Sequence, residues 1–79
     1  MPQMITDLLH KGYTSWNQPE TLVEVGMELE SRSRLSEAQL FLKRAIELDP
    51  KNFPQAYVIL AYSFMRENKP EDGEIAFTN

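Results

Sequence analysis

The stretch AIELDP, residues 45–50, combines a helix-forming run with an abrupt stop at Pro50. A proline disfavours helical geometry at the residue before it, so the sequence predicts that a helix ends here. The run begins with a small residue, Ala45, and carries Ile46 and Leu48 as apolar residues. Either it is the end of one helix, or it closes a repeated unit, and the two alternatives predict different kinds of function.

Apolar residues recur at helical spacing along almost the whole chain. No stretch alternates apolar and polar residues over enough length to predict a strand. The sequence therefore predicts an all-α fold of four or five short helices joined by short turns. A first short helix carries an apolar stripe that contains Met4, Ile5, Leu8 and Leu9.

Turn and cap residues set the expected boundaries of the helices. Gly12 is the predicted stop of the first helix, and Pro19 suits the first turn of the second. Ser36 is the predicted N-cap of the next helix, because a serine hydroxyl can accept a bond from a free backbone N–H. Asn52 is the predicted N-cap of the following one, with Pro54 in its first turn. A last helix is expected from Glu71 or Asp72 to Asn79.

A shift of 35 residues lays the chain on itself so that large apolar residues meet large ones and small residues meet small ones. The pairs are Leu22 with Tyr57, Val25 with Leu60, Gly26 with Ala61, Leu29 with Phe64, Ala38 with Gly73, and Leu42 with Phe77. One such helix pair cannot bury its apolar face alone, whereas stacked copies can. Gly26 and Ala38 would let the paired helices of the first unit approach closely.

This order of large and small residues resembles the tetratricopeptide repeat (TPR). The residues that carry the resemblance are Leu22, Val25, Gly26, Leu29, Ala38, Leu42, Ala45 and Pro50. It implies a single domain over residues 1–79, made of antiparallel helix-turn-helix repeats that stack into an α–α superhelix. Repeat one would span 19–53, and repeat two, which is truncated, would span 54–79. Residues 1–18 do not fit the repeat and are expected to form an N-terminal helix that covers the first pair, with Tyr13 and Trp16 as anchors.

Two repeats with an open C-terminal end would leave apolar surface uncovered, including Phe64, Ile75 and Phe77. We therefore expect one of two situations. Either the chain is a piece of a longer repeat protein, or its open end pairs with another chain, which would make self-association part of its function.

Composition narrows the function classes. The net charge is −4, with 12 acidic and 8 basic residues, and the isoelectric point is near 4.8, which argues against a nucleic-acid module. No apolar run approaches the roughly 20 residues of a membrane span, and the N-terminus does not read as a signal peptide. The absence of cysteine favours a reducing compartment, so we expect a cytoplasmic protein.

Catalysis finds little support in the sequence. A chain of 79 residues has a thin core, and no phosphate loop, metal-ligand cluster or nucleophile motif is visible. His10 is the only histidine, and it lies beside an apolar stripe, where a surface or core-edge role is expected. We predict that the protein is not an enzyme and uses no cofactor or metal.

The resemblance implies a partner-binding concave face lined by the first helix of each pair. Helix register places these residues on it: Glu20, Val23, Glu24, Met27, Glu30, Gln55, Val58, Ile59, Tyr62, Met65 and Arg66. The face would be acidic on one side and rich in Met and Tyr on the other, which suits a protein or peptide partner with a basic, amphipathic segment. Val23, Met27 and Ile59 stand where the family's carboxylate clamp needs Lys and Asn, so a chaperone-tail adaptor is not expected.

Other interpretations stay open at this point. The glutamates can be a solvated helix face, and the apolar residues Val58, Tyr62 and Met65 can be covered by neighbouring repeats or by the N-terminal helix. The leading prediction is a protein-binding or scaffolding module. The alternative is the N-terminal repeat region of a larger protein, for instance a glycosyltransferase or methyltransferase, that serves positioning or oligomerisation.

Overall fold

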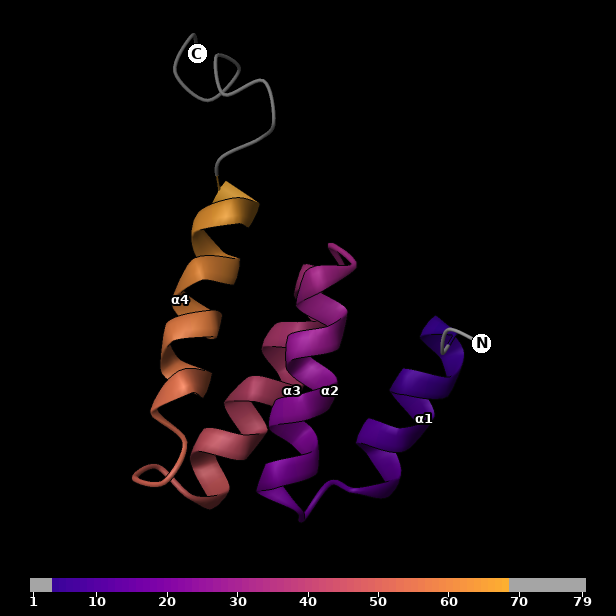
Figure 1. Cartoon of the computed structure of the whole chain (residues 1–79), viewed down its shortest axis with the longest axis vertical. Coiled ribbons are helices and arrows are strands. Elements are labelled where there is room, and N and C mark those ends of the chain that lie inside the picture. Colours follow the sequence, from indigo (N-terminus) through magenta and orange to yellow (C-terminus); the bar gives the residue numbers. More distant parts are fainter. Residues whose placement is uncertain (1–3, 69–79) are drawn as a thin grey trace, which may run out of the picture.

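The computed structural model describes residues 4–68, which form four α-helices and contain no strand. The helices are α1 (Ile5–Thr14), α2 (Pro19–Ser31), α3 (Leu35–Leu48) and α4 (Pro54–Asn68). Each helix runs antiparallel to the one before it, so α2 and α4 point the same way (Figure 1). The prediction of an all-α chain is confirmed for this part of the sequence. The predicted last helix, from Glu71 or Asp72 to Asn79, lies outside the described residues.

The antiparallel pair α2–α3 is the centre of the fold and shares the most extensive interface. Gly26 lies where the two helices cross: a Cβ atom at this position would come within 2.6 Å of Leu42 Cγ and 3.4 Å of the Ala38 carbonyl oxygen. The absence of a side chain therefore lets the axes approach, as the sequence predicts for Gly26 and Ala38. Ser33 closes the turn with a φ of 64°, and the Arg34 N–H donates to the Leu29 carbonyl oxygen at 2.9 Å.

The hydrophobic core lies mainly between α2 and α3 and extends to the two outer helices. Its largest fully buried side chains are those of Phe41, Leu22, Leu29, Leu42 and Val25. Three fully buried alanines also belong to the core. These residues are Ala38, Ala45 and Ala56. Burial of these side chains is the main stabilising term, at about 1.5–3 kcal/mol for each large one.

Helix α1 covers one side of the pair through an aromatic cluster. The centroids of the Tyr13 and Trp16 rings lie 5.1 and 6.1 Å from the centroid of the Phe41 ring. These contacts make Tyr13 and Trp16 the anchors that the sequence predicts. The expectation that Gly12 stops the helix is wrong, because α1 continues to Thr14. Gly12 is buried, and a Cβ atom there would lie 2.6 Å from the Phe41 ring, so its role is close packing.

Arginine 44 fixes the loop after α1. Its Nε donates to the Trp16 carbonyl oxygen at 3.0 Å, and its Nη2 donates to Asn17 Oδ1 at 2.7 Å. The guanidinium also lies over the Trp16 ring, 5.2 Å from the ring centroid, which is a cation–π geometry. These contacts attach the first helix to α3 at a second point beside the aromatic cluster.

Two predicted caps are wrong. Helix α3 begins at Leu35, so Ser36 lies inside its first turn, and the N-cap residue, Arg34, makes no side-chain cap bond. Asn52 does not cap α4 but bridges the preceding turn, with Nδ2 donating to both carboxylate oxygens of Asp49 at 2.9 and 3.0 Å. The AIELDP stop is confirmed, since α3 ends at Leu48 and Asp49 is its C-cap.

Helix α4 packs mainly on α3 and also touches α2. Its inward side carries Ala56 and Ser63, both fully buried. Gln39 of α3 donates from Nε2 to Ser63 Oγ at 3.3 Å and to Glu67 Oε1 at 3.1 Å, a polar contact in the α3–α4 interface. The residues of α4 that the 35-residue shift pairs with buried residues of α2 are only partly covered. Leu60 among them is half-buried, and the others, Tyr57, Ala61 and Phe64, are exposed.

Candidate partner-binding face

Helices α2 and α4 are joined at one end by Arg66. Its guanidinium pairs with the Glu30 carboxylate, donates to the Glu30 carbonyl oxygen at 2.9 Å and donates to Ser33 Oγ at 2.7 Å. It also lies over the Tyr62 ring at 5.8 Å. The structure therefore brings together two residues that the sequence assigns to opposite sides of the face, Glu30 and Arg66, and holds them as an internal clasp.

Helix α4 exposes a row of large apolar residues. Val58, Tyr62 and Met65 are 66%, 54% and 60% exposed and follow one another at helical spacing. Val58 and Met65 come two positions after the buried residues Ala56 and Ser63, which is about 200° around a helix, so they point away from the bundle. Tyr62 is turned toward α2, on the side of the Arg66 clasp. Large apolar residues that gather on a surface in this way are typical of contact sites.

The neighbouring side of α2 is acidic. Glu20 and Glu24 are exposed, Met27 is 44% exposed, and Gln55 is exposed at the start of α4. Within residues 4–68, neither Glu20 nor Glu24 forms an ion pair. The positive charge of Arg66 is offset by Glu30, so the unpaired carboxylates set the sign of the potential on this side.

Two residues of the predicted face contribute less surface than expected. Val23 is only 3% exposed and belongs to the core cluster. Ile59 is half-buried against the same cluster. Val23 lies seven residues before Glu30, which is about two helical turns, so it shares the side of α2 that Glu30 turns toward Arg66 of α4. We define the α2–α4 face by the exposed residues that remain, together with the clasp. These are Glu20, Glu24, Met27, Gln55, Val58, Tyr62, Met65, Glu30 and Arg66.

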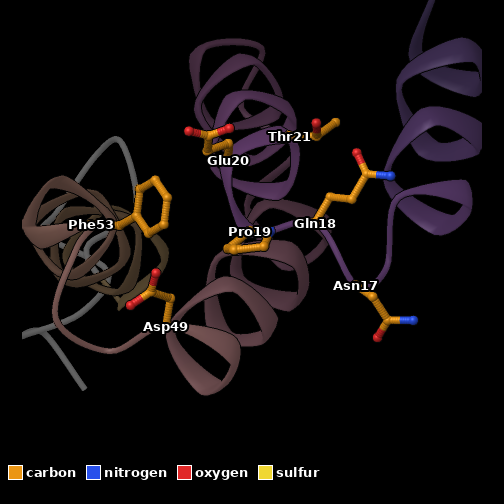
Figure 2. A pocket seen from close by; sticks show the side chains of 7 residues that line it. All are labelled: Asn17, Gln18, Pro19, Glu20, Thr21, Asp49 and Phe53. Carbon is orange, nitrogen blue, oxygen red and sulfur yellow. The ribbon is translucent and has the colours of Figure 1, made fainter.

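A pocket of about 320 Å³ opens at the start of α2 and was not predicted from the sequence (Figure 2). We call it the foot pocket, and seven residues line it: Asn17, Gln18, Pro19, Glu20, Thr21, Asp49 and Phe53. They come from the α1–α2 loop, the first turn of α2, the end of α3 and the loop before α4. No sequence signal marks the pocket, because two stretches far apart in the chain, 17–21 and 49–53, build it, although Glu20 also belongs to the α2–α4 face.

The single histidine of the described residues does not line the foot pocket. His10 is exposed on α1. No group of three or more His, Cys, Asp or Glu residues within 4–68 is placed to hold a metal ion. None of the four helices, as far as they are described, is both long enough and apolar enough to span a membrane. The α2–α4 face can bind another molecule through apolar contacts and charge.

Comparisons with models of protein families, with curated proteins and with solved structures found no match to this chain. The surface of the molecule itself is therefore the guide to its function.

Proposed function

We propose that the chain is a protein-binding module of TPR-like helical repeats, whose α2–α4 face takes a basic, amphipathic segment of a partner protein. The observation that carries the proposal is the exposed apolar row Val58, Tyr62 and Met65 beside the unpaired carboxylates of Glu20 and Glu24. An amphipathic segment would place its apolar side chains on α4 and its basic ones along α2.

The repeat part of the proposal is supported by local geometry. Helices α2 and α4 each begin at a proline, Pro19 and Pro54, at the spacing of the internal sequence shift. The close crossing at Gly26 is the contact that the small positions of such a repeat would serve. Helices α2 and α4 run parallel, and α3 packs against both. A helix pair followed by the first helix of the next pair would have this arrangement in a stacked repeat.

The test begins with peptide ligands selected from a random display library against the immobilised chain. Binding of a selected peptide to wild type, Tyr62→Ala and Met65→Ala would be measured by fluorescence anisotropy. We expect each substitution to weaken binding about 5-fold or more, because the proposal makes Tyr62 and Met65 central anchors, and the minority of interface residues that act as anchors cost about 1 kcal/mol or more on truncation. Met4→Ala is the matched control, because Met4 is 65% exposed and lies at the start of α1.

Two results would contradict the proposal. One is selection of peptides whose affinity is the same for wild type, Tyr62→Ala and Met65→Ala, which would place the binding site elsewhere. The other is a selected set without excess Lys and Arg, or binding that does not weaken with added salt, because screening reduces attraction between exposed charges.

A further inference from the structure

We propose that the foot pocket is a subsite for an arginine side chain of the partner segment. The inference rests on the proposed function, because it assigns the pocket to the same partner that lies on the α2–α4 face. It adds the chemical identity of one anchor residue and the end of the face at which that anchor binds.

The pocket is large enough to admit one long side chain. Its volume of about 320 Å³ is at the lower end of the range of small-molecule sites, roughly 300–1,000 Å³. The pocket is open to solvent, and Glu20, one of its lining residues, is exposed. A side chain can therefore enter it from a segment that passes Glu20.

The charges in the pocket select a cation. Glu20 and Asp49 contribute two carboxylates, and none of the seven lining residues is basic. The Asp49 carboxylate accepts bonds only from the uncharged amide of Asn52 among the described residues, so its negative charge is not neutralised. An arriving cation would find two acceptor groups and no competing positive charge in the wall.

The aromatic wall favours arginine over lysine. In the view of Figure 2, the Phe53 ring lies beside the carboxylates of Glu20 and Asp49, all on one side of Pro19. A planar guanidinium can stack on a ring and donate to two carboxylates at once, because it carries five N–H donors in a fixed plane. An ammonium is a hydrated point charge and gains less from such a wall.

The position of the pocket gives the bound segment a direction. Glu20 belongs both to the foot pocket and to the α2–α4 face, so the two surfaces are continuous. The other end of the face is closed by Arg66, which is already bonded to Glu30 and Ser33. The partner's arginine would therefore lie at the start of α2, and its apolar residues would follow toward Met27 and Tyr62.

The test uses acetyl-arginine-amide as a probe with the full 79-residue chain, followed by ¹H–¹⁵N correlation spectra. We expect saturable shifts of the Glu20, Thr21 and Phe53 amides at millimolar concentration. Acetyl-citrulline-amide has the same shape without the charge and should produce no saturable shift. Acetyl-lysine-amide should bind more weakly than the arginine probe. Equal shifts from the citrulline probe, or shifts spread evenly over the molecule, would overturn the inference.

Variants place the probe in the pocket. Glu20→Gln, Asp49→Asn and Phe53→Leu should each weaken the arginine probe about 3- to 5-fold, the scale of one exposed ion pair. Asp7→Asn, an exposed carboxylate on α1, is the control that changes the charge equally and should leave the affinity unchanged. Asp49 also holds the turn, so Asp49→Asn can lower the melting temperature. In that case the Glu20→Gln result is the decisive one. An unchanged affinity in Glu20→Gln would refute the subsite.

Failure of the subsite and failure of the proposed function are distinguishable. If selected peptides need Tyr62 and Met65 but the arginine probe leaves the pocket amides unshifted, the face binds partners without this anchor, and only the subsite is refuted. If the probe binds the pocket while Tyr62→Ala and Met65→Ala leave peptide affinity intact, the α2–α4 face is refuted and the pocket no longer belongs to it.

Discussion

Gly26 and Gly12 hold positions where a Cβ atom would collide with a side chain of α3. At Gly26 the neighbour is Leu42, and at Gly12 it is the ring of Phe41, both at 2.6 Å. Leu42 and Phe41 are fully buried, so neither can move aside without disturbing the core. A glycine inside a helix costs about 1 kcal/mol relative to alanine, and here the close approach of the helices offsets that cost.

Substitution of Gly26 by alanine should therefore destabilise the protein. We expect the free energy of unfolding to fall by about 1–3 kcal/mol, because overpacking against Leu42 outweighs the gain in helix propensity. Urea denaturation followed by circular dichroism at 222 nm measures this change in the free energy of unfolding. The reverse control is Ala61→Gly on the exposed side of α4, which should cost about 1 kcal/mol through propensity alone. A more stable Gly26→Ala protein would show that the crossing has room for a methyl group.

The two glycines also show what could be predicted at this scale. The role of Gly26 is readable from the sequence, because the 35-residue shift pairs it with another small residue, Ala61. Gly12 has no such partner, and its local neighbours suggest only a helix stop. The residue that decides its role, Phe41, lies in another helix. Its proximity follows from the packing of α1 and not from any local pattern.

Among the elements, the helix starts marked by proline were predictable and the side-chain caps were not. Pro19 and Pro54 begin α2 and α4 because their fixed φ suits the first turn of a helix. Ser36 and Asn52 have good capping chemistry, but Leu35 joins α3, and Asn52 finds a closer acceptor in Asp49. Capping preferences are weak, at about 1 kcal/mol, so packing and turn contacts decide between neighbouring positions.

The interface of α3 and α4 gives a prediction at the same scale. Gln39→Leu would leave the fully buried Ser63 hydroxyl without its described donor, and we expect a loss of about 1–3 kcal/mol in unfolding free energy. Adding Ser63→Ala removes the orphaned group, so the double variant should recover most of the loss. A double-mutant cycle by urea denaturation measures the coupling. Additive effects of the two substitutions would mean that this polar contact does not hold α4 on α3.

The candidate face also has parts that the sequence predicts and parts that only the packing of the helices determines. Exposure of Val58, Tyr62 and Met65 on α4 agrees with the helix register that the sequence provides. Burial of Val23 could not be read from its own helix, because it depends on where α4 crosses α2. The foot pocket was not predictable at all, since its walls come from two distant stretches, 17–21 and 49–53, whose meeting point is fixed only by the tertiary fold.

At the scale of the whole molecule, the helices differ in how much of their surface is buried. Helices α2 and α3 each bury five residues within the described chain, whereas the buried residues of α1 are Leu8 and Gly12. Helix α4 has two small inward residues, Ala56 and Ser63, and an exposed outer side. Because local opening costs less where fewer apolar contacts are broken, stability should be graded along this order of helices.

Native-state hydrogen exchange should resolve this gradation. We expect amides in the middle of α2 and α3 to exchange last, and those of α1 and α4 to exchange earlier through local opening. Arg44→Ala should lower protection in α1 selectively, because it removes the bonds to Trp16 and Asn17 and leaves the α3–α4 contacts in place. Exchange at one common rate in all four helices, with Arg44→Ala lowering all of them equally, would instead mean that the described helices open only together. The α2–α4 face would then stay intact until global unfolding.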